Sequence, residues 1–208
     1  MTRTALVGVA RTALFVSAAL VSRTSAVAGQ APMEEQIAAA VRPLSPGLRD
    51  GATVFGYREG NELEVLRWGS NGFVCESDPP GDARYQVRCF EAALTPFMRR
   101  RDELNAAGIQ GDARLEIMAA EVEAGMLDLP SGSIEMSLKG RIDESTGVPD
   151  SLSLTHYIYL PFATAESTGL STTDGRDGKP YLMDPGHLDA HMHVPGPVRP
   201  FRRPSHMP

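Results

Sequence analysis

Two cysteines, Cys75 and Cys89, constrain the fold of this chain more than any other feature. They are the only cysteines in the sequence, and the residues between them include a Pro-Pro-Gly break at 79–81. In an oxidising compartment a chain with two cysteines most simply pairs them. By the loop-closure entropy, a cross-link that closes a loop of about 15 residues stabilises the folded protein by about 3 kcal/mol. We therefore predict a disulfide between Cys75 and Cys89.

The alternative for these cysteines is a reactive thiol pair. A reactive thiol needs neighbours that stabilise the thiolate, such as arginine. The intervening loop holds two arginines, but three carboxylates oppose them: Arg84, Arg88, Glu76, Asp78 and Asp82. This mixture of charges favours the structural disulfide.

Residues 1–28 are typical of a secretory signal peptide. Arg3 and Arg11 supply a positive n-region, residues 13–21 form an apolar h-region, and Ala26-Val27-Ala28 precedes a cleavage site before Gly29. An N-terminal transmembrane anchor is the alternative, but a bilayer needs about 20 apolar residues. We therefore expect export to the periplasm or the extracellular space, and no membrane span in the mature chain.

The net charge of the chain bears on which kinds of molecule it could bind. Without residues 1–28, which hold three arginines and no acid, 17 basic residues face 26 acidic ones, a formal charge of −9. This balance argues against nucleic acid as a partner. The remaining length suits a single domain with a substantial core, predicted over residues 29–195. The Pro- and Arg-rich tail, 196–208, is predicted to be extended or disordered.

Hydrophobic periodicity predicts the first half of the domain. A short helix is expected over 33–41, and two strands over 52–57 and 62–68 form a hairpin. Asn71-Gly72 favours a tight turn before a third strand at 73–75.

The period becomes helical after Cys89. Thr95-Pro96 is typical of a helix start and Gly108 of a helix end. A second helix is expected from Asp112 to Gly125, and the two should form a helical hairpin packed on the sheet. The run Arg99-Arg100-Arg101 could bind an anion. Because consecutive helical positions fan around the axis, and because acids follow directly, a solvated helix face is favoured.

Strand periodicity then returns. Residues 133–139 alternate, with Ile134, Met136 and Leu138 inward and Ser133, Glu135, Ser137 and Lys139 outward. Residues 151–160 alternate again, with His156 on the apolar side. A mobile loop is expected over 163–179; its Asp174 and Asp177 lack the ligand spacing of an EF-hand calcium loop. Together these elements predict an α+β fold: a mostly antiparallel sheet with a helical hairpin inserted between its N- and C-terminal strands.

Histidines near the C-terminus form a candidate metal site. His187, Asp189, His191 and His193 occupy alternate positions, so on a strand they would share one face. His191 and His193 would lie about 7 Å apart and could chelate one divalent ion. A turn at Asp184-Pro185-Gly186 could return His187 or Asp189 as a third ligand, and His156 is the other candidate donor. The alternative is a pair of exposed histidines and a core His156.

Four segments, LRWGSNGFVC (66–75), SIEMSLKG (133–140), THYIYLP (155–161) and AHMHVP (190–195), together resemble a group of uncharacterised exported bacterial proteins. That group has a similar S/T-N-G-aromatic-x-Cys corner and two late strands that begin with histidine. The likeness covers residues 52–195. This chain departs from it in the RYQVR segment before Cys89 and in the extra His and Asp neighbours of the last strand. The resemblance implies export and a one-domain architecture, and it implies no chemistry.

Two functions from different classes remain, because the sequence has no nucleophile elbow, P-loop or dinucleotide fingerprint. The first is a non-catalytic exported domain that binds a small apolar ligand or a surface partner, favoured by the Met and Tyr residues of the last strands. The second is a metal-dependent enzyme that uses His191, His193 and a carboxylate or His156. The two hypotheses differ in whether His156 lies across from His191.

Overall fold

The computed structural model describes residues 31–58, 62–81, 83–143, 145–149, 151–173 and 178–200. The predicted signal peptide, Asp174 and Asp177 of the long loop, and residues 201–208 of the predicted tail lie outside this part of the chain.

The described elements follow one another in a mixed order of helices and strands. They are α1 (Met33–Ala40), α2 (Pro46–Arg49), β1 (Thr53–Gly56), β2 (Glu64–Arg67), β3 (Phe73–Glu76), β4 (Arg84–Glu91), the 3-10 turn η1 (Ala92–Leu94), α3 (Thr95–Ala106), α4 (Gly111–Glu123), β5 (Ile134–Asp143), β6 (Val148–Pro149), β7 (Ser151–Tyr159), α5 (Ala165–Thr168), β8 (Tyr181–Met183) and β9 (His191–Pro200).

The strands form one sheet in the order β2-β1-β3-β4-β5-β7-β9-β8, with β6 paired onto the end of β5. Only β1 and β3 pair in parallel; the other described pairs are antiparallel. The predicted hairpin of β1 and β2 is confirmed. The helices α3 and α4 stand between β4 and β5 in the chain, which confirms the predicted α+β fold with an inserted helical hairpin.

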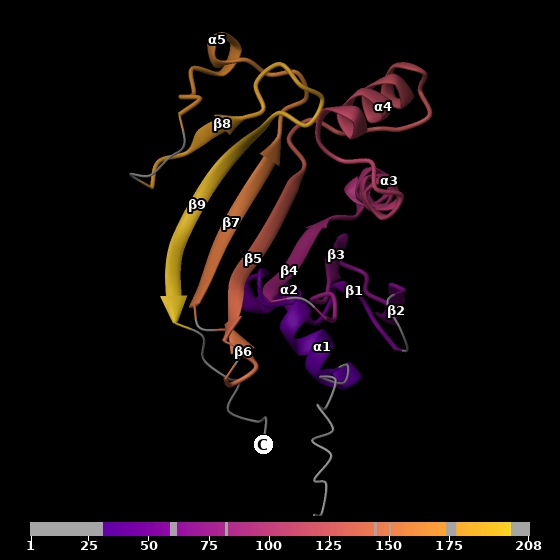
Figure 1. The fold of residues 1–208 in the computed structure, drawn as a ribbon, viewed down its shortest axis with the longest axis vertical. Helices are drawn as coiled ribbons and strands as arrows, with labels where there is room; N and C mark the ends of the chain where they lie inside the picture. Colours follow the sequence, from indigo (N-terminus) through magenta and orange to yellow (C-terminus); the bar gives the residue numbers. More distant parts are fainter. Residues whose placement is uncertain are drawn as a thin grey trace, which may run out of the picture.

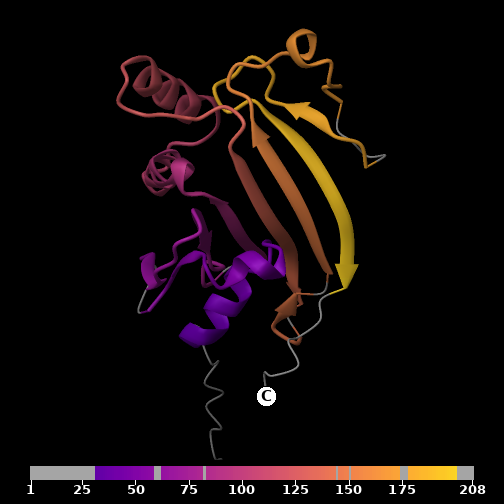
Figure 2. The same ribbon diagram turned by 180° about the vertical axis from the view of Figure 1, so that it is seen from behind.

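Different helices cover the two faces of the sheet. On one face, Ala40 at the end of α1 and Leu44 just after it pack against Cys75 and Met136; we call this the α1 face. On the other, Phe97 of α3 and Met118 of α4 belong to a second core with Val74 and Phe90; we call this the α3 face. Consecutive strand residues point to opposite faces, so Val74 and Cys75 belong to different cores. Figure 1 shows α3 and α4 beside the long strands, and Figure 2 shows α1 in the view from the opposite side of the molecule.

The predicted disulfide is confirmed. Cys75 of β3 and Cys89 of β4 lie directly opposite each other, are bonded, and are fully buried on the α1 face. The turn before β3 is the one that Asn71-Gly72 predicts. Gly72 has φ +79°, and the Phe73 N–H donates to Asn71 Oδ1 over 3.1 Å. The cross-link therefore lies in the core, next to a turn that is itself held by a side chain.

The helix ends agree with the sequence only in part. Gly108 and Gly125 end α3 and α4 with positive φ, as predicted. Thr95 does not cap α3, because the turn η1 leads into this helix and places Leu94 at the N-cap. Asp112 is likewise not a cap: α4 begins at Gly111, and Asp112 lies in its first turn, where the helix dipole favours an acid.

The strand β9 is longer than predicted. It pairs with β7 as far as Pro200, so residues 196–200 belong to the sheet and not to a tail. Gly196 makes this possible, because a Cβ there would lie 2.2 Å from the carbonyl oxygen of Leu154. The short β8 pairs only with the first three residues of β9. In the part of the chain that the structure describes, nothing pairs with the outer side of residues 194–200.

Pro195 suits this open edge. The Tyr159 N–H donates to Ser133, away from β9. Thr155 lies four residues before Tyr159 on the same strand, so its backbone N–H and C=O also point away from β9. Thr155 is opposite Pro195, and the nitrogen of Pro195 therefore points away from β7. A proline at an edge whose nitrogen faces outward sacrifices no hydrogen bond within the sheet. No helix in the described part of the chain is long and apolar enough to cross a membrane.

Candidate functional site

The polar side of β5 is buried, contrary to the prediction. The residues alternate as expected, but Glu135 is only 4% exposed and Ser137 is fully buried. Both lie on the α3 face, so the inserted helices cover the row that the sequence places in solvent. Lys139, further along the same row, is exposed as predicted. A covered row of polar side chains is therefore the starting point of the site.

The three consecutive arginines of α3 reach three different elements. Their ion pairs are Arg99 with Glu76 of β3 at 3.0 Å, Arg100 with Glu121 of α4 at 2.9 Å, and Arg101 with Glu135 of β5 at 3.7 Å. All three side chains are at least partly buried, so the predicted solvated face is wrong. The fan of consecutive helical positions is what directs them to separate partners.

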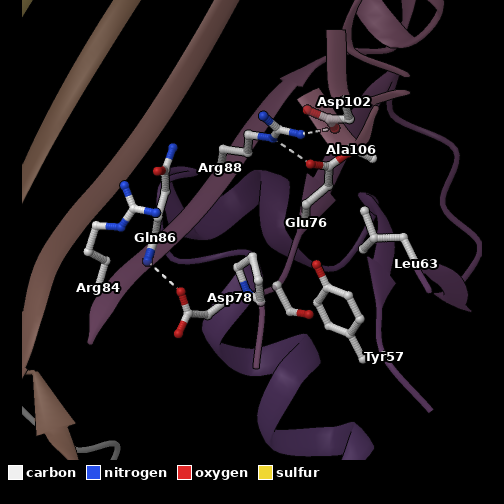
Figure 3. Close-up of a pocket in the computed structure, with 11 residues that line it drawn as sticks. Tyr57, Leu63, Glu76, Asp78, Arg84, Gln86, Arg88, Asp102 and Ala106 are labelled. Atoms are coloured by element: carbon white, nitrogen blue, oxygen red, sulfur yellow. Dashed lines mark hydrogen bonds and ion pairs between the residues drawn. The ribbon is translucent and has the colours of Figure 1, made fainter. Parts of the chain in front are cut away.

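Arg88 of β4 stands at the centre of these charges. It donates hydrogen bonds to Glu76 and to Asp102 of α3 (Figure 3). Burial opposes its charge, but the two carboxylates outweigh burial and raise the pKa of Arg88. Arg88 therefore stays charged and joins β4, β3 and α3 under the helix.

Glu135 is the second buried charge of the α3 face. The Tyr159 hydroxyl donates to its carboxylate over 2.8 Å. Burial alone would raise the pKa of Glu135, but Arg101, Arg88 and this hydrogen bond outweigh it and hold the pKa below its ordinary value. Burial and the charge of Glu135 raise the pKa of Tyr159 well above that of a free tyrosine. The pair is thus a carboxylate and a neutral phenol at physiological pH.

Two pockets flank Arg88. The first, of about 380 Å³, lies toward β1 and the segment after β3 and is lined by Tyr57, Glu76 and Asp78 among others (Figure 3). Asp78 accepts the backbone N–H of Gln86 over 2.6 Å. Burial and the charge of Glu76 raise the pKa of Tyr57 to about 12. The polar groups of this pocket mostly satisfy one another.

The second pocket, of about 460 Å³, lies between the helices α3 and α4 and the strands β5, β7 and β9. We call it the His191 pocket. Three polar atoms on its lining are buried without a hydrogen-bond partner: Arg114 Nε, Asp189 Oδ1 and His191 Nε2. They come from α4, from the segment before β9 and from β9 itself. Their convergence distinguishes this pocket from the first.

The hydrogen bonds of these residues assign the roles of the three atoms. The Arg114 Nη1–H group donates to Asn105 Oδ1 over 3.0 Å, and Arg114 Nε remains a donor without a partner. His191 Nδ1 lies 2.8 Å from the carbonyl oxygen of Asp189. Because a carbonyl only accepts, we assign the proton to Nδ1, and Nε2 is then an acceptor. Burial and the nearby Asp184 raise the pKa of Asp189.

A ladder of aromatic rings forms the wall of the pocket on the sheet. Tyr181 stacks on His193 at 4.8 Å between ring centres, and Tyr157 meets His193 and His191 edge-on at 5.1 and 5.2 Å. His193 Nδ1 lies 3.0 Å from the sulfur of Met183. Burial, His191 and Lys139 together lower the pKa of His193. At physiological pH this wall therefore carries a neutral imidazole at His193.

The structure brings together part of the predicted metal site. His191 and His193 share a face, and the turn at Asp184 and Gly186 returns Asp189 to the same pocket. His187 is exposed and does not line it.

His156 lies on the other face of the sheet. It faces Val194, whereas Tyr159 faces His191. Consecutive positions of a strand point to opposite faces, so His156 cannot meet His191. Among the described residues, no group of three or more His, Cys, Asp or Glu side chains could hold a metal ion.

Sequence reasoning missed Arg88, Arg114 and Glu135. One signal was present: charged or polar residues alternate with apolar ones on both β4 and β5. When the polar side of a central strand is buried, the element that packs on it must carry complementary charges. The helix α3 carries them in the run Arg99-Arg100-Arg101.

Chemically, the His191 pocket offers one free donor, two free acceptors and an aromatic wall, and this is an arrangement for holding a small molecule. Comparison with family models, with curated proteins and with solved structures found no match to this chain.

Proposed function

We propose that this protein is an exported, non-catalytic domain that binds a small polar ligand in the His191 pocket. The observation that carries the proposal is the convergence of Arg114 Nε, Asp189 Oδ1 and His191 Nε2, all buried and unpartnered, on one pocket. Each unsatisfied buried group costs about 1–3 kcal/mol, and native proteins hold few of them. A ligand that pairs with all three removes this cost when it binds.

The three atoms describe the ligand. Arg114 Nε needs an acceptor, while Asp189 Oδ1 and His191 Nε2 need N–H or O–H donors. In the described part of the chain neither Arg114 nor Lys139 has a carboxylate within ion-pairing distance, and Lys139 donates only to the Tyr157 hydroxyl. These two cations favour an anionic group. A small hydroxy- or amino-carboxylate meets each of these requirements.

This ligand is more polar than the one that the sequence predicts. The prediction of an apolar ligand assumed that Met and Tyr dominate the site. The buried polar row of β5 and the arginines of α3 change its chemistry. We do not propose the metal-dependent enzyme, because His156 does not face His191 and no described group of three His, Cys, Asp or Glu side chains could hold a metal ion. Export is supported by the residue pattern at 1–28 and by a disulfide of the kind that persists in oxidising compartments.

The test is a thermal-shift and calorimetric screen of the purified protein. Hydroxy acids and amino acids form one set of ligands, and neutral sugars and aliphatic alcohols form the other. We expect members of the first set to raise the melting temperature through binding to the native state. Arg114→Gln should weaken their binding at least tenfold.

The matched control is Arg58→Gln. Arg58 is exposed, pairs with Glu64 at 3.4 Å and lines neither pocket, so this variant should bind as the wild type does. Saturable binding of neutral compounds alone would contradict the proposal. So would carboxylate binding that Arg114→Gln leaves unchanged.

A further inference from the structure

We propose that Met183, His193 and His191 form a binding site for a soft monovalent metal ion, Cu(I), at the β8 end of the His191 pocket. The site differs from the divalent site that the sequence suggests. A thioether stands in place of the carboxylate or His156, and the site does not require the organic ligand proposed above.

The first two donors already lie together. Met183 on β8 and His193 on β9 come from neighbouring strands, and Met183 Sδ lies 3.0 Å from His193 Nδ1. Metal bonds to imidazole nitrogen and to sulfur are about 2.0 and 2.3 Å long. Two donors 3.0 Å apart can therefore share one ion after a small opening of the contact. A thioether is a weak hydrogen-bond acceptor, so Nδ1 loses little when a metal replaces its proton.

His191 supplies the third donor. Its Nδ1 proton is committed to the Asp189 carbonyl, so the buried Nε2 carries a lone pair without a partner. The rings of His191 and His193 lie 6.4 Å apart between centres. Two imidazoles on one ion place their ring centres about 6 Å apart, from bonds of about 2.0 Å. Rotation of the side chains, with no change in the sheet, completes a three-coordinate site.

The donor types select the ion. A thioether with two imidazoles is a soft, uncharged set that suits Cu(I), whereas Mg²⁺ and Ca²⁺ prefer oxygen donors. Thiolates would compete for a soft ion, but both cysteines of the chain are joined in the disulfide. On binding, the metal occupies His193 Nδ1 and the ring carries its hydrogen on Nε2, so the imidazole stays neutral.

Silver(I) is the first probe, because it has the same preference for thioether and imidazole and undergoes no redox change. The protein with ¹³C-methyl methionine is titrated with silver nitrate in chloride-free buffer. We expect the Met183 methyl resonance to shift and to saturate at one equivalent. Isothermal calorimetry should show one site, and Met183→Leu should weaken it at least tenfold. Cu(I) under anaerobic conditions should show the same dependence.

Met136→Leu is the matched control. Met136 lies directly across from His156, a second methionine–histidine pair, on the α1 face. This variant should bind silver as the wild type does. Binding that Met183→Leu leaves intact, binding lost in Met136→Leu, or no shift of the Met183 methyl in the wild type would each overturn the proposal. The methyl shift needs no variant, so misfolding cannot imitate it. Arg114→Gln should keep silver binding, which separates this site from the organic ligand.

Discussion

Glu135 is a buried carboxylate of the α3 face, and its protonation links the stability of the domain to pH. Its side chain lies under α3, accepts a hydrogen bond from the Tyr159 hydroxyl and forms an ion pair with Arg101. Protonation of this carboxylate would remove the counter-charge that it offers to Arg101, and an unpaired charge in the interior costs several kcal/mol. The stability of the domain should therefore depend on the protonation of this group.

The pH dependence follows from the direction of the shift. The pKa of Glu135 is lower in the folded protein than the value of about 4.3 in the unfolded chain. Its contribution to stability is present above the unfolded pKa and is lost as the pH falls through the folded pKa. We expect the free energy of unfolding, measured by urea denaturation, to fall below about pH 4.3. Glu135→Gln should cost about 3 kcal/mol at pH 7 and flatten this fall.

Glu64→Gln is the control for this prediction. Glu64 forms an exposed ion pair with Arg58, which should be worth less than about 1 kcal/mol. The variant should therefore follow the wild-type profile. Parallel stability profiles for the wild type and Glu135→Gln would show that Glu135 does not carry the acid sensitivity.

Elements whose signals are local could be predicted from the sequence. Asn71-Gly72 marks the turn before β3, Gly108 and Gly125 mark helix ends, and the spacing of two cysteines marks a cross-link. What depends on the pairing of distant segments could not be predicted. The face on which His156 lies follows from the register of β7 against β9. Arg114 and Asp189 line the same pocket only because α4 packs near the segment before β9. For the same reason, the sequence could not show that the polar side of β5 is covered.

The disulfide allows a prediction at the scale of elements. It joins β3 to β4 within the core of the α1 face, and it restricts the unfolded chain by linking residues at a sequence separation of 14. Replacing both cysteines, Cys75→Ala with Cys89→Ala, should lower the free energy of unfolding by about 3 kcal/mol. Urea denaturation of the double variant and of the wild type measures the difference. Equal stabilities, or free alkylatable thiols at both positions of the native protein, would contradict the structural role.

At the scale of the whole molecule, one sheet separates two cores. The α1 face contains the disulfide and is mainly apolar, whereas the α3 face combines an apolar end with the ion pairs of Arg88 and Glu135. The pocket that we propose for binding therefore lies on the side of the sheet opposite the disulfide, and the buried charges of that side also contribute to stability. Substitutions around the disulfide should affect folding, while those around His191 should affect binding.

Export is the prediction that belongs to the whole chain. Expressed in a bacterial host, the exported protein should begin at or near Gly29 when its N-terminus is sequenced. Ala28→Phe should impair cleavage, because signal peptidase requires a small residue at this position. An intact Met1 on wild-type protein in the membrane fraction would indicate an anchor and refute the signal peptide.

The outer side of β9 determines how the molecule behaves beside its own copies. A strand with free donors and acceptors at a sheet edge can recruit a strand from another chain, which is the first step of ordered aggregation. Pro195 presents a nitrogen without a hydrogen to this edge, and the register shift opposite Ser153 and Thr155 interrupts the straight run that a foreign strand would need. The prolines that suggest a disordered tail in the sequence thus have a second consequence. They leave the flank of the sheet a poor template for self-assembly, even where the protein is concentrated.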